Sequence, residues 1–219
     1  MAVEETEVLK VDPEDPDPEA IERAARAVQE GGLVILPTDT VYGVVCDPRL
    51  PAAVEEVYRV KDRRRELPLA LLLRDMAQVS AYVQDVPETA VRAMQQFWPG
   101  GLTVILRDTR EATAAIRAGK KTIGLRLPAH VVPRLVADRL GFALASTSAN
   151  RSGQPAPTTA EQAAEQLRGL VALVLDAGPA PVGQESTVVN FAEGPPRVMR
   201  AGAISVERLR EVLGEVRES

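Results

Sequence analysis

Apolar and polar positions alternate along this chain with two different periods. Over residues 20–30 the apolar positions Ile21, Ala24, Ala25 and Val28 recur every three or four residues, which is the spacing of one helix face. Between such segments lie short apolar runs, such as 33–36 and 69–73, which have the length of buried strands. Gly31-Gly32 after the first helix and Pro37 after the first strand agree with these limits.

The same pattern continues through most of the chain and predicts its fold class. Helices are expected at 20–30, 51–61, 76–82, 88–97, 131–140, 160–167 and 206–213, and strands at 33–36, 69–73, 102–106, 122–127, 142–146, 171–175, 187–191 and 197–199. Thr159 with Gln162 resembles a capping box. Short strands that alternate with helices indicate one α/β domain with a sheet covered on its faces. The chain shows no fixed-period repeat and no break in composition after residue 20.

The acidic residues are concentrated at the N-terminus. Residues 1–20 hold eight acidic side chains and one base, Lys10, so that the remaining residues sum to +2 although the chain of 219 residues has a net charge of −5. We expect residues 1–18 to form a flexible acidic leader with a short strand around 8–11, residues 19–213 to form one folded domain, and 214–219 to form a tail. The leader lacks the apolar core of a secretory signal, and the longest apolar runs are too short to span a membrane, so a soluble cytoplasmic protein is expected.

Histidine and cysteine are too scarce to carry the chemistry. The chain has one Cys, Cys46, and one His, His130, which excludes an internal disulfide and a zinc site built from these residue types. We interpret Cys46 as a core residue and His130 as a surface or capping residue. Any catalysis must therefore rely on Lys, Arg, Ser, Thr, Asn and carboxylates.

Three polar stretches are candidates for a site, because ligands of α/β sheets bind in loops beyond the strand ends. Residues 37–43 and 146–153 are rich in hydroxyl and amide groups, and each could equally be an ordinary polar turn. Residues 59–65 hold five bases, which fit a helix C-terminus, a phosphate clamp or a nucleic-acid patch. The 3% aromatic content and negative net charge disfavour nucleic acid, and neither a P-loop nor a Rossmann glycine motif is present.

Taken together, these stretches resemble the YrdC-like family of threonylcarbamoyl-AMP synthases. The resemblance rests on Pro37–Gly43 (PTDTVYG), Lys61-x-Arg63, Pro68-Leu69, 98–103 (WPGGLT), 124–128 (GLRLP), Ser148-x-Asn150, 185–189 (ESTVV) and 200–204 (RAGAI). It runs in order from about residue 19 to 213, and resembles the short form without the extra C-terminal domain. It implies a twisted mixed α/β sheet around an open, positively lined cavity.

The resemblance also implies a reaction. L-Threonine, bicarbonate and ATP would give threonylcarbamoyl-AMP and pyrophosphate, and the product would serve modification of the adenosine next to the anticodon in tRNA. Mg²⁺ would arrive with ATP, held by the substrate rather than by a protein metal site. Partners would be downstream tRNA threonylcarbamoyl-transfer proteins, with weak contact to tRNA itself and none to a membrane.

The family's functional positions map onto this sequence residue by residue. Catalytic roles are implied for Lys61, Arg63, Ser148 and Asn150; ATP binding for Arg63, Leu67, Thr122, Ser148, Ala156 and Arg200; and L-threonine binding for Thr38, Leu72, Arg126, Ser146 and Ser186. Arg126 would hold the threonine carboxylate, and Lys61 with Arg63 would stabilise charge on the phosphates. This interpretation requires the guanidinium groups of Arg63, Arg126 and Arg200 to meet in one basin.

Two positions depart from the family pattern. Arg64 stands where the family commonly has Pro, and Leu72 stands where many members have a His that touches threonine. Leucine offers only apolar contact, so the recognition of the threonine hydroxyl stays open.

Two other functions are weighed against this enzyme. An RNA-binding module on the same fold would bind phosphates with a steep salt dependence and would have no use for a carboxylate clamp at Arg126. A carbamoyl-transfer enzyme of the hydrogenase-maturation type would need Cys-rich zinc modules, for which one Cys leaves no room.

Overall fold

The computed structural model describes residues 6–108 and 111–218, and the predicted α/β fold is confirmed. The described residues form one sheet in the order β1-β8-β2-β3-β7-β4-β6-β5-β9-β10-β11. The strands are β1 (Glu7–Lys10), β2 (Val34–Leu36), β3 (Gly43–Cys46), β4 (Ala70–Leu72), β5 (Leu102–Arg107), β6 (Thr122–Arg126), β7 (Leu144–Ser148), β8 (Leu173–Asp176), β9 (Thr187–Asn190), β10 (Arg197–Arg200) and β11 (Arg217–Glu218). The sheet is mixed: β4 pairs with β6 in parallel, for example, while β3 pairs with β7 antiparallel.

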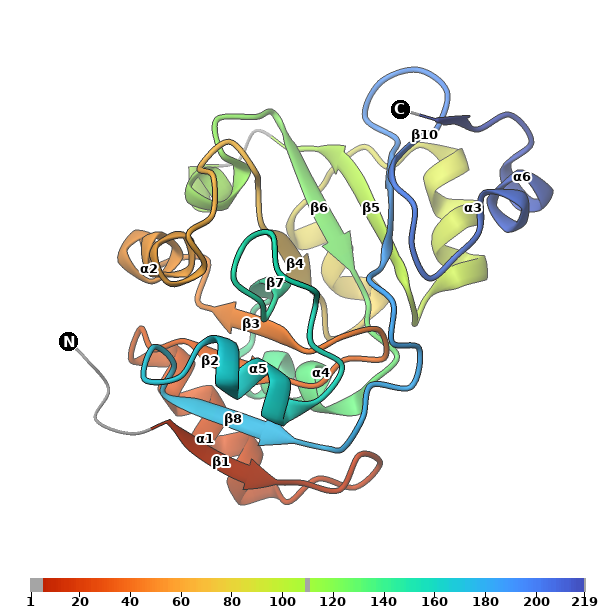
Figure 1. Cartoon of the computed structure of the whole chain (residues 1–219). Helices are drawn as coiled ribbons and strands as arrows, with labels where there is room; N and C mark the ends of the chain where they lie inside the picture. Colours follow the sequence, from red (N-terminus) through yellow and green to blue (C-terminus); the bar gives the residue numbers. More distant parts are fainter. Residues whose placement is uncertain (1–5, 109–110, 219) are drawn as a thin grey trace.

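Helices flank this sheet on both sides. They are α1 (Pro18–Gln29), α2 (Pro51–Lys61), α3 (Glu88–Phe97), α4 (Val131–Leu140), α5 (Ala160–Gln166) and α6 (Val206–Leu213), with 3-10 helices η1 (Met76–Ala81) and η2 (Glu111–Arg117). Figure 1 shows the strong twist of the sheet, since β1, β8 and β3 lie across the view while β5 and β6 run steeply through its upper half. None of the helices within the described ranges is long and apolar enough to cross a membrane.

His130 and Thr159 cap helices as predicted, but the reciprocal bond of a capping box is replaced, because Gln162 Oε1 accepts from Thr158 N at 2.8 Å. The His130 side chain caps α4 by accepting a hydrogen bond from Val132 N at 3.2 Å. Thr159 Oγ1 accepts from Gln162 N at 3.2 Å at the start of α5. Asp17 caps α1, which is followed by Gly31 at a φ of +85°, a conformation that glycine adopts without steric cost. Cys46 is fully buried, as expected.

Several elements differ from the prediction. Residues 43–46 form strand β3, where no strand is predicted from the sequence. The strand expected at 142–146 lies two residues later, at β7, while the helix expected at 76–82 is present as the 3-10 helix η1. Neither η2 nor the two-residue β11 was expected.

The N-terminal segment contributes an edge strand. The strand expected around 8–11 is present as β1, which pairs in parallel with β8, and Val11 N donates to Asp176 O at 2.8 Å. Residues 1–5 of the predicted leader lie outside the described residues. The division of the chain at residues 18 and 213 stays a prediction.

On one face of the sheet, the side chains change along the strand order from large and apolar to small and polar. Around β2 and β3 this face carries Val34, Leu36 and Val45, and helices α1 and α4 pack against it. Because side chains alternate across a strand, the same face continues through small and polar positions, namely Gly43, Ser146, Ala70, Gly124 and Thr103. These small side chains leave space above this part of the sheet, and a cavity lies there.

The opposite face is mostly apolar and packs in the larger core of the protein. It carries Val44, Leu71, Leu125 and Val104, which pack in one core with residues of α2 and α3. Burial of a side chain such as that of Leu125 contributes about 1.5–3 kcal/mol. The strands that carry the cavity floor are therefore held by this core on their other face.

Candidate active site

A cavity of about 300 Å³ lies over the open part of the sheet. Its lining draws on strands β3 to β7, on β9 and β10, and on the loops that follow β2 and α2. Nine of the thirteen residues predicted for the site line it, namely Thr38, Arg63, Leu72, Thr122, Arg126, Ser146, Ser148, Ser186 and Arg200. The other four, Lys61, Leu67, Asn150 and Ala156, are not among the lining residues.

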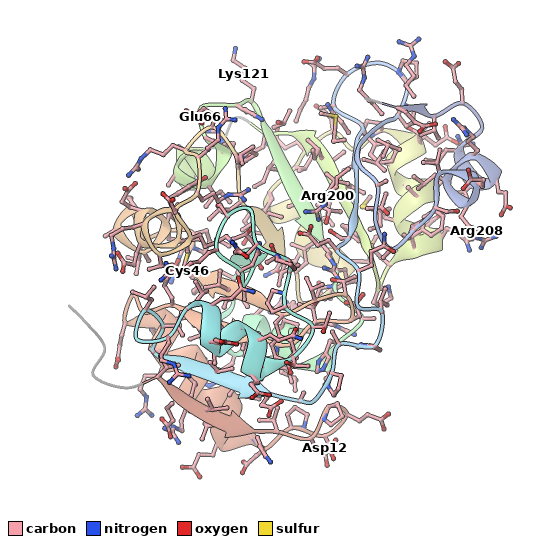
Figure 2. The ribbon with its side chains drawn as sticks, in the orientation of Figure 1. Asp12, Cys46, Glu66, Lys121, Arg200 and Arg208 are labelled. Atoms are coloured by element: carbon pink, nitrogen blue, oxygen red, sulfur yellow. The ribbon has the colours of Figure 1, made fainter. Side chains whose placement is uncertain are left out.

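The three arginines meet in this cavity, which confirms the expectation from the sequence. Arg63 follows helix α2, Arg126 ends β6 and Arg200 ends β10, so that three distant parts of the chain converge. Figure 2 shows Arg200 near the centre of the view, beside β6. The charged lining residues are these three, Lys120 and one acid, Glu185. Such a surface attracts anionic ligands.

Arg126 is buried and held by two segments, the turn after β2 and the loop before β5. Nε donates to Gly100 O at 3.0 Å, Nη1 to Thr40 Oγ1 at 2.7 Å, and Nη2 to Asp39 Oδ1 at 2.7 Å. Burial lowers the pKa of Arg126 from its usual value, and the adjacent Asp39 carboxylate opposes that shift. An arginine fixed in this way can present its remaining N–H groups to a carboxylate without reorganisation.

Arg200 and Ser186 form a second cluster across the cavity. Arg200 Nη2 donates to Ser186 O at 2.9 Å and to Ser186 Oγ at 3.1 Å, and Nη1 donates to Glu185 Oε1 at 2.8 Å. Ser186 Oγ also lies 2.9 Å from Thr103 Oγ1. The Arg200–Glu185 pair is partly exposed, so an anionic ligand can compete with Glu185 for the guanidinium.

Arg63 contacts the segment that leads into β4. Its Nη2 donates to Pro68 O at 3.1 Å and its Nε to Leu67 O at 3.3 Å. Burial lowers the pKa of Arg63, and nearby Arg200 adds to that effect. Leu67 thus supports Arg63 through its carbonyl oxygen, while its side chain is exposed.

Lys61 lies behind the cavity wall. Its side chain is 1% exposed, and Nζ donates to Ser148 O, Asn150 O and Asn150 Oδ1. Asn150 Oδ1 in turn accepts from Ser148 Oγ at 2.6 Å. The three N–H groups of a lysine ammonium match these three acceptors. Lys61 therefore fastens the loop after β7, while Ser148 faces the cavity.

The small hydroxyl residues take up two different arrangements. Thr38 Oγ1 donates to Val41 O at 2.6 Å and accepts from Thr40 N at 3.1 Å, which closes the turn after β2. Ser146 projects from β7 beside Gly43, where an added Cβ would lie 3.1 Å from Ser146 Oγ. Residues 37–43 therefore form a hydrogen-bonded polar turn that also lines the cavity.

Sequence reasoning missed several residues of the site. Asp39, Thr40, Thr103 and Glu185 all lie within quoted motifs, but no role was assigned to them. Lys120, Asn190 and Met199 line the cavity without belonging to those motifs. Asn190 could have been found from the period of two along β9, which puts it on the same face as Val188.

Comparisons with known proteins agree with this geometry. The family model for Sua5, YciO and YrdC proteins, described as telomere recombination, matches residues 26–202. Threonylcarbamoyl-AMP synthase of Pyrococcus abyssi is 34% identical over 194 residues, which cover 89% of this chain and 57% of that protein. Threonylcarbamoyl-AMP synthase of Bacillus subtilis is 36% identical over 201 residues, which cover 91% of this chain and 58% of that protein.

A solved structure gives the same result. The crystal structure of P. abyssi Sua5 complexed with L-threonine superposes with a TM-score of 0.93 and 33% identity, covering 98% of this chain and 63% of that one. The chain thus spans less than two thirds of the length of these relatives. The match to the family model includes the residues from Thr38 to Arg200 that line the cavity. On these grounds, the chain belongs to the Sua5/YciO/YrdC family.

Proposed function

We propose that this protein synthesises L-threonylcarbamoyl-AMP from L-threonine, bicarbonate and ATP and releases pyrophosphate. The observation that carries the proposal is the convergence of Arg63, Arg126 and Arg200 on one cavity of about 300 Å³. Two relatives that match about 90% of this chain are named threonylcarbamoyl-AMP synthases, and the Sua5 structure with L-threonine supports the amino-acid substrate.

The cavity divides between two substrates. Arg126, with Thr38 and Ser146 nearby in the lining, takes the carboxylate and the amino-acid end of threonine. Arg63 and Arg200 take the phosphates, with Thr122 and Ser148 beside them. Leu72 is buried and lines the cavity, so it offers an apolar wall for the threonine methyl.

The chemistry then proceeds in two steps. The threonine nitrogen attacks the carbon of bicarbonate and loses a proton, water leaves, and a carbamate results. A carbamate oxygen attacks the α-phosphorus of ATP, and the bond to the β-phosphate oxygen breaks to release pyrophosphate. Arg63 and Arg200 stabilise the charge that develops on the phosphate oxygens. Lys61 acts on this step by holding the Ser148–Asn150 loop.

Mg²⁺ enters this proposal as part of the ATP substrate. Among the described residues there is no cluster of three or more potential metal-binding side chains, and Glu185 is the one acidic group in the lining. Phosphate oxygens would supply most of its ligands. The transfer of the product to tRNA by downstream proteins, weak tRNA contact and a cytoplasmic location belong to the same proposal.

Pyrophosphate release provides the test. The purified protein is incubated with ATP, Mg²⁺ and bicarbonate, with and without L-threonine, and the nucleotide product is identified by mass spectrometry. We expect pyrophosphate release that depends on threonine, together with threonylcarbamoyl-AMP. If there is no such release, and the protein instead binds RNA with an affinity that falls steeply with salt, the RNA-binding alternative replaces the proposal.

A further inference from the structure

Asp39 is a buried acidic residue directly behind the cavity wall. It is 7% exposed and does not line the cavity, although its neighbours Thr38 and Thr40 do. Asp39 Oδ1 accepts two hydrogen bonds, from Arg126 Nη2 at 2.7 Å and from Ala129 N at 3.0 Å. The carboxylate therefore joins the turn after β2 to the end of β6 and to the segment that follows it.

These contacts determine how the Arg126 guanidinium lies. An arginine has five N–H groups. Three of the Arg126 nitrogens each donate one hydrogen bond to a described residue, namely to Gly100 O, Thr40 Oγ1 and Asp39 Oδ1. Two N–H groups are left, which is the number that a carboxylate accepts in a bidentate pair. The plane of the guanidinium is fixed before any ligand arrives.

We propose that Asp39 is a positioning residue for the amino-acid substrate, acting through Arg126. By accepting from Arg126 Nη2 and Ala129 N, it holds the guanidinium so that the remaining N–H groups receive the substrate carboxylate. Asp39 itself touches no substrate. This inference rests on the proposed function, since it takes L-threonine as the ligand.

The direction of the change in threonine affinity distinguishes this positioning role from an alternative role, in which Asp39 competes with the ligand for Arg126. A carboxylate that merely competed with the ligand for Arg126 would, when removed, leave the cavity more cationic and threonine binding tighter. When a positioning carboxylate is removed, Arg126 keeps its bonds to Gly100 O and Thr40 Oγ1 but is less firmly oriented, and threonine binding becomes weaker. The two roles therefore predict opposite changes in the same dissociation constant.

The experiment measures the binding of L-threonine and of ATP by calorimetry, using the full chain and its variants Asp39→Asn and Asp39→Ala. For Asp39→Ala we expect threonine affinity to fall by about tenfold or more, as for a lost hydrogen bond to a charged group, with ATP affinity within about twofold of the parent. Asp39→Asn retains an acceptor oxygen and should lose less, which keeps the test informative if the alanine variant does not fold.

Asp47 supplies a matched control. It is another buried aspartate paired with an arginine, since Asp47 Oδ2 lies 2.7 Å from Arg49 Nη2, but neither residue lines the cavity. Asp47→Asn should leave threonine affinity unchanged even if it lowers the melting temperature. Unchanged or tighter threonine binding in both Asp39 variants would overturn the inference. A parent protein that fails to bind threonine at all would instead overturn the proposed function.

Discussion

Glu185 and Arg200 form an ion pair at the edge of the cavity, with Glu185 Oε1 2.8 Å from Arg200 Nη1. Both side chains are partly exposed, so the pair itself contributes little to stability. The pair affects ligand binding instead. Glu185 occupies one N–H group of Arg200 and contributes the one negative charge among the described lining residues.

Replacement of Glu185 should therefore strengthen ATP binding. In Glu185→Gln the phosphates no longer meet a carboxylate, and Arg200 becomes available to them. We expect the dissociation constant for ATP to fall by roughly twofold to fivefold at low salt, and less at high salt because of screening. Binding of a non-hydrolysable ATP analogue at two salt concentrations measures this; weaker binding in the variant would show that Glu185 contacts the nucleotide favourably.

Arg126 and Arg200 should affect different substrates. Arg126→Lys keeps a positive charge beside Asp39 but lacks the planar fork, so threonine binding should weaken by about 1.5–3 kcal/mol, while ATP binding changes little. Alanine is a poorer choice at this position because it would leave Asp39 buried without its ion pair.

Arg200→Ala should show the reverse selectivity. ATP binding should weaken toward the lower end of the same range, about 1.5 kcal/mol, because Arg200 is partly exposed. Calorimetric titration of both ligands into both variants checks the division of the cavity. The opposite assignment of the two arginines would contradict it.

Lys61 should make the stability of the protein depend on pH. Burial lowers its pKa to about 7, and nearby Arg63 adds to the shift, whereas an unfolded lysine titrates near 10.5. Between pH 7 and 10.5 the unfolded chain thus binds more protons, so the contribution of Lys61 to the free energy of unfolding rises with pH, by up to about 1.4 kcal/mol per pH unit.

A comparison with Lys61→Met isolates this effect. We expect the difference in unfolding free energy between the parent and Lys61→Met to move in favour of the parent as the pH rises from 7 to 9. Urea unfolding at several pH values measures it. A difference that stays constant over this range would mean that the three oxygen acceptors keep Lys61 protonated.

The convergence of distant segments on one cavity could be predicted from the sequence, but which side chains line that cavity could be predicted less well. Arg63, Arg126 and Arg200 each belong to a motif with a fixed order along the chain, so their convergence follows from the resemblance. Lys61 lies only two residues from Arg63, yet it does not line the cavity, and its ammonium donates to Ser148 and Asn150 in the loop after β7. The local cause is the end of helix α2, where Asp62 adopts a φ of 51° and turns the chain. No spacing rule reveals that turn.

Hydrogen bonds and ion pairs between residues far apart in the sequence could not be predicted either. Asp39 and Arg126 stand 87 positions apart, and each is a plausible surface residue when taken singly. Strand β3 was missed for another reason, since residues 43–46 are uniformly apolar and short, which gives no period to distinguish a strand from a buried turn. Its assignment depends on pairing with β2 and β7.

Gly202 allows the segment after β10 to approach the cavity, and a side chain there should disrupt both stability and ATP binding. A Cβ at this position would lie 2.3 Å from Glu185 O and 2.7 Å from Ser186 C, both main-chain atoms that have little room to move. The neighbouring hydrogen bond from Ala203 N to Glu185 O, at 2.8 Å, would have to lengthen. Gly202→Ala should therefore cost about 1–3 kcal/mol of stability.

Displacement of Glu185 and Ser186 in Gly202→Ala should also affect ATP binding, because Arg200 donates hydrogen bonds to Ser186 O and to Glu185. We expect weaker ATP binding in Gly202→Ala at a temperature where the variant is fully folded, with threonine binding less affected. Ala201→Ser serves as control, since Ala201 is exposed and should change neither quantity. If Gly202→Ala lowered the melting temperature but left ATP affinity intact, the loop would stabilise the fold without placing Arg200, and the nucleotide part of the cavity would depend on Arg63 instead.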